Sequence, residues 1–239
     1  MDRELGLSEH LGELRKRLII CLVSLGIGIV CSMPFAQLLL RVLKFPAAGL
    51  IEKLVFFSPQ EAFLIYMRIA FFCGLSFSMP VILYQLWSFV SPAMDERLKR
   101  YSNDFIIGSS FLFVIGCLFS YYLLIPPALK FLLSFASEDL EPVISATKYI
   151  SFVLSLIFGC GLVFLMPILS LIFTKLGLIN ARVLRRKYKY ALVIILIVSA
   201  IITPTPDAFN MCLLALPMLF LYELSIWISF FARPRTKAV

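Results

Sequence analysis

Runs of apolar residues long enough to cross a bilayer alternate with short polar segments along this chain. A membrane helix needs about 20 mostly apolar residues, and several of the runs reach or exceed that length. Helices satisfy their own backbone polar groups inside hydrocarbon, so we predict an all-α protein with six transmembrane helices. The predicted spans are residues 18–40, 61–89, 105–124, 149–173, 190–202 and 208–231, within a single membrane domain covering residues 1–239.

Prolines and capping residues set several predicted boundaries. The segment Ser58-Pro59-Gln60-Glu61 has the spacing of a capping box and begins the second span. Proline lacks an N–H and clashes with the preceding turn, so Pro34 kinks or ends the first span and Pro126-Pro127 end the third. Before the sixth span, Thr205 is the predicted N-cap and Asp207 lies in the first turn.

The fifth predicted span is unusually short. Its 13 residues give only about 20 Å of helix, against a hydrocarbon core of about 30 Å. A helix shorter than the bilayer is accommodated by local thinning of the bilayer. We therefore predict a thin bilayer at this corner of the protein.

The N-terminal segment before the first span carries an apolar stripe with i, i+4, i+7 and i+11 spacing, formed by Leu7, Leu11, Leu14 and Leu18. We predict an amphipathic helix along the membrane face, continuous with or hinged to the first span. Glu13 in this segment has two interpretations. It forms a helix-surface ion pair with Arg17 four residues later, or it is a fixed binding acid.

Composition and charge agree with a membrane protein and give its orientation. The chain is 61% hydrophobic and 15% charged, with a mean hydropathy of +0.97, far from the roughly 25% charged residues of soluble domains. Sixteen of its 22 lysines and arginines lie in the N-terminal segment, the loops after spans two and four, and the tail. By the positive-inside rule both termini are cytoplasmic, as an even number of spans requires. The net charge of +8 does not indicate nucleic-acid binding, because no basic domain has interleaved aromatic residues.

Sequence motifs for catalysis are absent. There is no phosphate-binding glycine loop, no HExxH pair and no nucleophile–base set, and the single histidine, His10, precedes the first span. All six cysteines lie inside apolar runs without a CxxC pair. We expect neither an enzyme nor a bound cofactor or metal. One intramembrane cation, Arg68, has two open interpretations, a functional charge or a side chain that snorkels to the interface.

Three separated motifs give the chain a resemblance to a known family. They are His10-Leu11-x-Glu13-Leu14-Arg15-Lys16-Arg17-Leu18, Pro80-Val81-Ile82-Leu83-Tyr84-Gln85-x-Trp87-x-Phe89-x-x-Pro92-Ala93 and Thr203-Pro204-x-Pro206-Asp207. In this order they resemble the hallmarks of the TatC family, the multispanning receptor subunit of the twin-arginine, Sec-independent protein translocase. The resemblance covers residues 8–231.

The resemblance implies a fold, a function and partners. The fold is a concave, glove-like six-helix bundle in the bacterial cytoplasmic (inner) membrane. The function is binding of twin-arginine signal peptides at the cytoplasmic face and export of folded proteins by the proton-motive force. The partners are single-span membrane proteins of the TatA and TatB type, in an oligomeric complex.

The resemblance also assigns roles by position. Glu13 becomes a signal-binding acid, with Arg15, Arg17 and Phe89 at the same site. The supporting positions are Pro46, Glu61, Pro80, Gln85 and Asp207.

The chain departs from the family pattern at three positions. Leu98 replaces a signal-binding glutamate, and we predict that Asp95, three residues earlier on the same helical face, takes its place, with Glu96 as second candidate. The alternative is that both acids only form i, i+4 pairs with the following cations. Leu165 and Met211 replace polar residues of the family, so we predict apolar contacts with the partner helix there.

Two other classes of function remain open from the sequence. A small-solute or ion transporter is supported by Arg68 and by the prolines of spans two, four and six, but it requires a polar site at the bilayer midplane between broken helices. A membrane scaffold fits the composition but leaves Glu13 unexplained.

Overall fold

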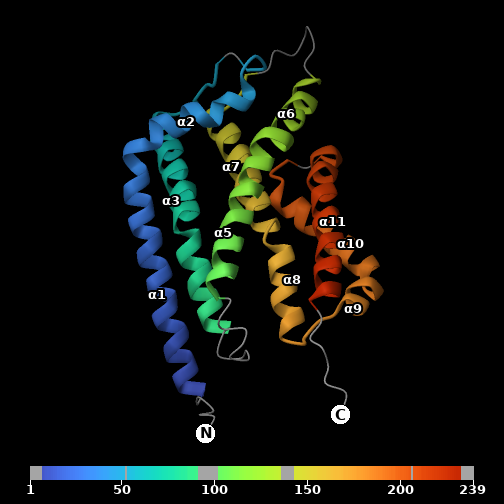
Figure 1. Ribbon diagram of the computed structural model, residues 1–239. Coiled ribbons are helices and arrows are strands. Elements are labelled where there is room, and N and C mark those ends of the chain that lie inside the picture. Colours follow the sequence, from blue (N-terminus) through green and yellow to red (C-terminus); the bar gives the residue numbers. More distant parts are fainter. Residues whose placement is uncertain (1–6, 52, 91–101, 136–142, 206, 233–239) are drawn as a thin grey trace, which may run out of the picture.

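The computed structural model describes residues 7–51, 53–90, 102–135, 143–205 and 207–232, and these residues are almost entirely helical. Five helical stretches in this part are long and apolar enough to cross a bilayer, and Tyr188–Ile202 is a sixth, shorter one. The start of the first helix and the end of the last helix lie at the same end of the bundle (Figure 1). The all-α prediction with six membrane helices is thus confirmed.

The first helix, α1 (Leu7–Ser32), includes the N-terminal segment without a hinge. It is therefore continuous with the span and does not lie along the membrane face (Figure 1). Helix α1 ends at Ser32, before the predicted residue 40, because Pro34 lies in a 3₁₀ turn, η1 (Met33–Phe35), although the apolar helical stretch continues to Ala47. The chain then turns into α2 (Ala36–Lys44), which runs across the top of the bundle, followed by η2 (Phe45–Ala47).

Helix α3 (Pro59–Val90) packs along most of α1 and continues through Pro80. The predicted capping box is only half right. The Glu61 carboxylate reaches back, but it accepts from the Phe57 N–H at 3.3 Å and from the Thr147 hydroxyl at 3.3 Å. Glu61 thereby joins the start of α3 to the start of α7 (Ala146–Val163).

The third span does not end at Pro126-Pro127. Helix α5 (Ser102–Phe119) passes through a π-helical turn, η4 (Ser120–Leu124), into α6 (Ile125–Leu133). In the wider turn the Ile125 N–H bonds to the Ser120 carbonyl five residues back. The two prolines then occupy the first turn of α6, where a missing N–H costs little.

The fourth span is divided into α7 (Ala146–Val163) and α8 (Met166–Lys175), with Pro167 in the first turn of α8. Ser145 caps α7 by accepting from the Lys148 N–H, so the helix begins at Ala146, three residues before the predicted start near residue 149. The break at residues 164–165 turns the side chain of Leu165 into the bundle, where it is 6% exposed.

The last region contains α9 (Ala181–Arg186), α10 (Tyr188–Ile202) and α11 (Ala208–Phe231). Asp207, not Thr205, is the N-cap of α11, and its carboxylate accepts from the Asn210 N–H at 2.7 Å. Burial alone would raise the pKa of Asp207, but hydrogen bonds from Asn210 and Thr205 lower the pKa below its usual value. The cap therefore stays charged at neutral pH, at the end of α11 opposite the C-terminus.

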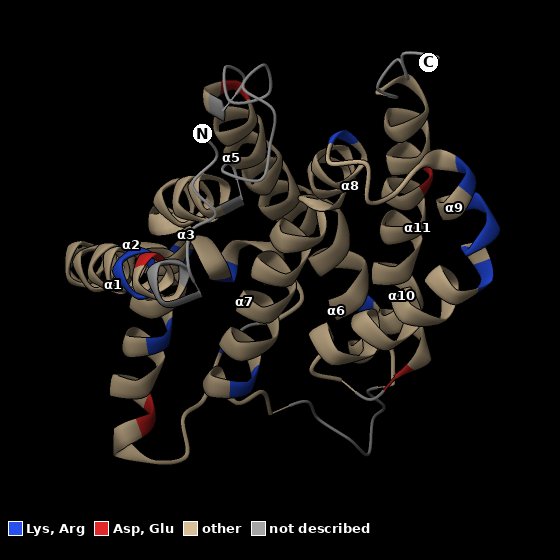
Figure 2. Ribbon diagram, turned by 90° about the horizontal axis from the view of Figure 1, so that it is seen from below, with Lys and Arg blue, Asp and Glu red and all other residues tan. Residues whose placement is uncertain are grey.

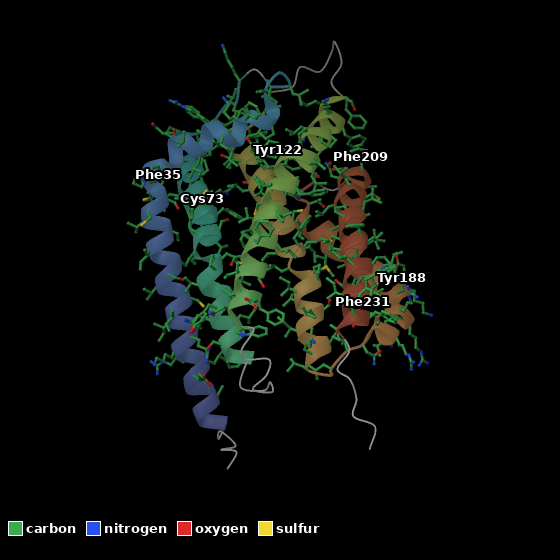
Figure 3. All side chains as sticks on the ribbon, viewed as in Figure 1. Phe35, Cys73, Tyr122, Tyr188, Phe209 and Phe231 are labelled. Carbon is green, nitrogen blue, oxygen red and sulfur yellow. The ribbon has the colours of Figure 1, made fainter. Side chains whose placement is uncertain are left out.

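The exterior of the bundle is apolar. Side chains project outward from all of the helices in Figure 3, and the exposed fractions are 59% for Phe35, 62% for Tyr122 and 77% for Phe231. Soluble monomers rarely expose such continuous apolar surface. The outer surface therefore faces lipid.

We expect a thinned bilayer beside α10. Its 15 residues span about 22 Å, short of a hydrocarbon core of about 30 Å. Nitroxide labels at the exposed positions Tyr190 and Ile201 should both report depths within a few ångströms of the lipid phosphates, whereas a label at Leu216 on α11 should lie near the bilayer centre. An undisturbed bilayer thickness beside α10 in these depth measurements would contradict the expectation.

Candidate signal-binding face and adjoining apolar groove

The candidate binding acid, Glu13, lies about two turns into α1, near its N-terminal end. Its carboxylate forms an ion pair with Arg17, and the side chains are 31% and 15% exposed. Arg17 also donates to the backbone carbonyl of Gln85 on α3 at 3.3 Å. Arg17 thus holds the acid on one side and the end of α3 on the other.

The ion-pair interpretation of Glu13 is therefore correct as a description of its contact. It does not remove the binding interpretation, because an ionised carboxylate has about four acceptor positions and can bond to two guanidinium groups. The contact to Gln85 fixes Arg17, which in turn limits where the Glu13 carboxylate can lie. The arrangement is a pre-positioned, partly exposed acid.

The structure describes only some of the other residues predicted for this site. Arg15 is exposed on α1, and Phe89 is half-buried in the last turn of α3. Asp95 and Glu96 lie outside the described residues, as does Leu98. The substitution of Asp95 or Glu96 for the missing glutamate stays a prediction.

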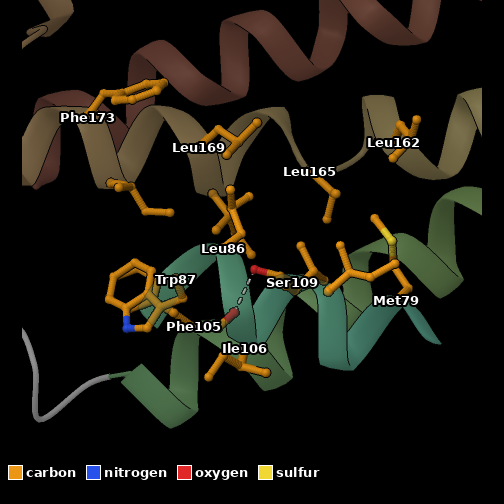
Figure 4. A pocket seen from close by; sticks show the side chains of 14 residues that line it. Met79, Leu86, Trp87, Phe105, Ile106, Ser109, Leu162, Leu165, Leu169 and Phe173 are labelled. Atoms are coloured by element: carbon orange, nitrogen blue, oxygen red, sulfur yellow. Dashed lines mark hydrogen bonds between the residues drawn. The ribbon is translucent and has the colours of Figure 1, made fainter. Parts of the chain in front are cut away.

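Beside this face, an apolar groove runs between α3, α5, α8 and the end of α7. Its cavity measures about 400 Å³. Figure 4 shows Leu162, Leu165 and Leu169 on one wall, across from Leu86, Trp87 and Phe105. Leu86 and Trp87 directly follow Gln85, so the groove begins next to the residue that anchors Arg17.

Two polar groups line this apolar groove. The Ser109 hydroxyl donates to the Phe105 carbonyl at 2.6 Å and is satisfied there. The indole of Trp87 stacks on Phe105 with ring centroids 4.5 Å apart, and its Nε1–H is buried with no acceptor in the described part of the chain. A buried donor of this kind costs free energy until an acceptor reaches it.

The remaining predicted residues are distributed along the bundle. Pro46 lies in η2 at the end away from Glu13, and Pro80 lies inside α3. Met211 is in the first turn of α11, at the end capped by Asp207, and does not line the groove. The structure therefore does not combine Leu165 and Met211 into one partner pocket.

Sequence reasoning missed the groove because its walls come from four separate helices. Trp87 belonged to a recognised motif, but nothing in the local pattern distinguished Phe105, Ser109 or Leu162 from lipid-facing residues. Arg68 was noticed, and its guanidinium donates to the Ser151 hydroxyl on α7. No group of three or more metal-ligating side chains occurs among the described residues.

Comparison with known proteins decides the family. A family model described as TatC, Sec-independent protein translocase protein, matches residues 9–217. The chain belongs to the TatC family. Relatives named Sec-independent protein translocase protein TatC are 37% identical over 234 residues in Carboxydothermus hydrogenoformans, covering 98% of this chain and 96% of theirs, and 38% identical over 237 residues in Aquifex aeolicus, covering 98% of both.

A solved structure agrees with the TatC assignment. A crystal structure described as the twin arginine translocase receptor TatC superposes with a TM-score of 0.85 at 38% identity, covering 94% of this chain and 99% of that one. The fold predicted from the TatC motifs is confirmed, and the chain is a multi-pass membrane protein of this family.

Proposed function

We propose that the protein is the receptor subunit of a Sec-independent translocase in the bacterial cytoplasmic membrane, and that it binds twin-arginine signal peptides of folded cargo. Membership of the TatC family and the partly exposed Glu13 carboxylate at the cytoplasmic end of α1 support this function. Glu13 accepts a peptide guanidinium beside Arg17, with Asp95 or Glu96 as a second acid.

The chemistry suits a peptide with two adjacent arginines. Guanidinium groups bind carboxylates through two parallel hydrogen bonds in a fixed geometry. Each charged hydrogen bond contributes about 1.5–3 kcal/mol, whereas ordering a flexible peptide costs about 2–5 kcal/mol. One or two acids therefore leave a modest affinity, which allows a receptor to release its cargo.

Photocrosslinking tests this function directly. A photoreactive peptide with paired arginines should label the purified protein at α1 near Glu13, and a peptide with paired lysines should label it far less. Lysine keeps the charge but lacks the planar fork that a carboxylate binds through two bonds. Equal labelling by the two peptides, or labelling confined to the opposite end of the bundle, would contradict the function.

We further propose that the apolar groove receives the transmembrane helix of a single-span partner of the TatA or TatB type. The groove lies in the half of the bundle nearer the cytoplasm, since Trp87 is near the end of α3 and Phe105 near the start of α5. Its lining offers almost no polar group to an entering helix. An apolar helix side chain facing Leu165 therefore fits this chain.

Replacing Leu165 by glutamate, Leu165→Glu, should weaken copurification of the native partner. Leu165 is 6% exposed and packs in a cluster with Met79, Leu83 and Phe113. An unpaired acid within a membrane costs about 2.5 kcal/mol or more. The matched control Leu165→Met keeps volume and polarity and should retain the partner, since such changes cost less than about 1.5 kcal/mol. Stronger copurification with the glutamate variant would contradict an apolar partner contact.

A further inference from the structure

A second groove, with one basic and one apolar wall, lies between α9 and the last turns of α11. Its cavity measures about 410 Å³ and is lined by Ala181, Arg182, Arg185, Ile226, Trp227 and Phe230. We call it the α9–α11 groove. The exposed fractions of Trp227 and Phe230 are 57% and 55%.

The cations of this groove are unpaired within the described residues. Arg182 and Arg185 lie three residues apart on one face of α9, both exposed and without a hydrogen bond or ion pair there. Seen from below in Figure 2, blue segments of α9 and of the chain entering α10 gather at this corner of the bundle. Glu223, one turn along α11 from Trp227, forms no ion pair with either arginine.

The groove lies beside the membrane part of α11, not beyond its end. The Tyr222 hydroxyl donates to the Leu184 carbonyl at 2.8 Å, and the rings of Tyr188 and Tyr222 are 5.7 Å apart. These contacts place α9 and the start of α10 level with Tyr222, nine residues before the end of α11, or about 14 Å by helix rise. The two arginines therefore stand next to apolar side chains that would otherwise contact acyl chains.

We propose that the α9–α11 groove binds an anionic phospholipid of the cytoplasmic leaflet. Its phosphate is held by Arg182 and Arg185, and an acyl chain lies along Ile226, Trp227 and Phe230. A phospholipid joins an anion to hydrocarbon chains, which matches one basic and one apolar wall, and basic pockets on the cytoplasmic side of membrane helices favour such head groups. A carboxylate alone would pair with the arginines but offers no hydrocarbon to the aromatic wall.

This site needs neither a signal peptide nor a partner subunit. The bound lipid has a further role beside the short helix α10, which spans only part of the bilayer. Arg182 and Arg185 draw the lipid phosphate toward the bilayer centre, and the bilayer is thinner where its head groups lie deeper. The bound lipid would stabilise the thin region of bilayer at this corner.

Tryptophan quenching tests the proposal, since the chain has only two tryptophans, Trp87 and Trp227. In the Trp87→Phe protein, reconstituted in vesicles, brominated phosphatidylglycerol should quench Trp227 with a relative association constant at least about fivefold above that of brominated phosphatidylcholine. That factor corresponds to one arginine near an anionic surface. The double variant Arg182→Gln/Arg185→Gln should lower the ratio toward one.

The matched control Arg186→Gln/Lys189→Gln removes the same charge from the same corner but not from the groove, and it should keep the preference. Equal quenching by both lipids, or an equal loss of preference in the two double variants, would overturn the proposal. Protection of Trp227 from both lipids would show that a protein covers the groove and would overturn it too. Native mass spectrometry of the protein with both tryptophans, counting retained phosphatidylglycerol, gives the same comparison without the Trp87→Phe change.

Discussion

Reversing the charge at Glu13, Glu13→Lys, should abolish binding of twin-arginine peptides while leaving membrane insertion intact. In the native protein Arg17 pairs with Glu13. The lysine of the variant would instead repel both Arg17 and the peptide arginines. Losing a charged hydrogen bond of about 1.5–3 kcal/mol weakens binding by at least about tenfold, before repulsion is added. Peptide affinity of purified protein and export of a twin-arginine cargo in cells measure the effect.

Two control variants separate peptide binding from helix stability. The swap Glu13→Arg/Arg17→Glu keeps an i, i+4 ion pair on α1 but moves the acid by one turn, and Arg17→Gln reports the loss of the bond to Gln85. If the swap recovered thermal stability and peptide binding together, Glu13 would serve the ion pair alone. We expect stability to recover in part and binding not to recover.

Placing a side chain at Gly28 or Gly74 should separate α1 from α3. A Cβ at Gly28 would lie 2.6 Å from the Gly74 carbonyl oxygen, and one at Gly74 would lie 2.5 Å from the Ile29 nitrogen. Both neighbours are backbone atoms, so the helices themselves must move. For Gly28→Val or Gly74→Val we expect destabilisation of about 1–3 kcal/mol or more, measured by thermal unfolding in detergent.

The same variants should also weaken peptide binding, because Arg17 on α1 reaches Gln85 on α3 only while the two helices stay in contact. Gly26→Val is the matched control, since a Cβ at Gly26 has no atom within 4 Å. If Gly26→Val lost as much stability and peptide binding as Gly28→Val, chain flexibility and not close packing would be the reason for glycine at these positions. Unchanged stability of all three variants would contradict the packing argument.

Within this protein, the length of the apolar runs was enough to predict six membrane helices, and charge asymmetry was enough to predict an orientation for them. Both follow from the cost of exposing backbone polar groups and cations to hydrocarbon, which acts on each segment separately. The end of α11 near Phe231 and the start of α3 at Pro59 were predicted closely for the same reason, because local composition and capping determine them.

Prolines could not be interpreted from the sequence alone. Pro34 ends α1, Pro80 leaves α3 continuous, and Pro126-Pro127 continue into α6 after a π-helical turn. Every one of these prolines lacks a backbone N–H. Whether the helix stops depends on whether neighbouring helices hold the chain on the far side of the break, and that is a tertiary property.

The candidate sites also contain some contacts that local sequence sets and others that only helix packing sets. The sequence by itself determined that an acid, Glu13, stands among cations before the first apolar run, since spacing along one helix fixes the Glu13–Arg17 pair. Only the tertiary structure decided that Arg17 also reaches Gln85, that Leu165 faces Trp87 across an apolar groove while Met211 lies elsewhere, and that Arg182 and Arg185 stand beside Trp227. Those contacts join residues far apart in the chain, and helix packing, which local sequence patterns do not encode, brings them together.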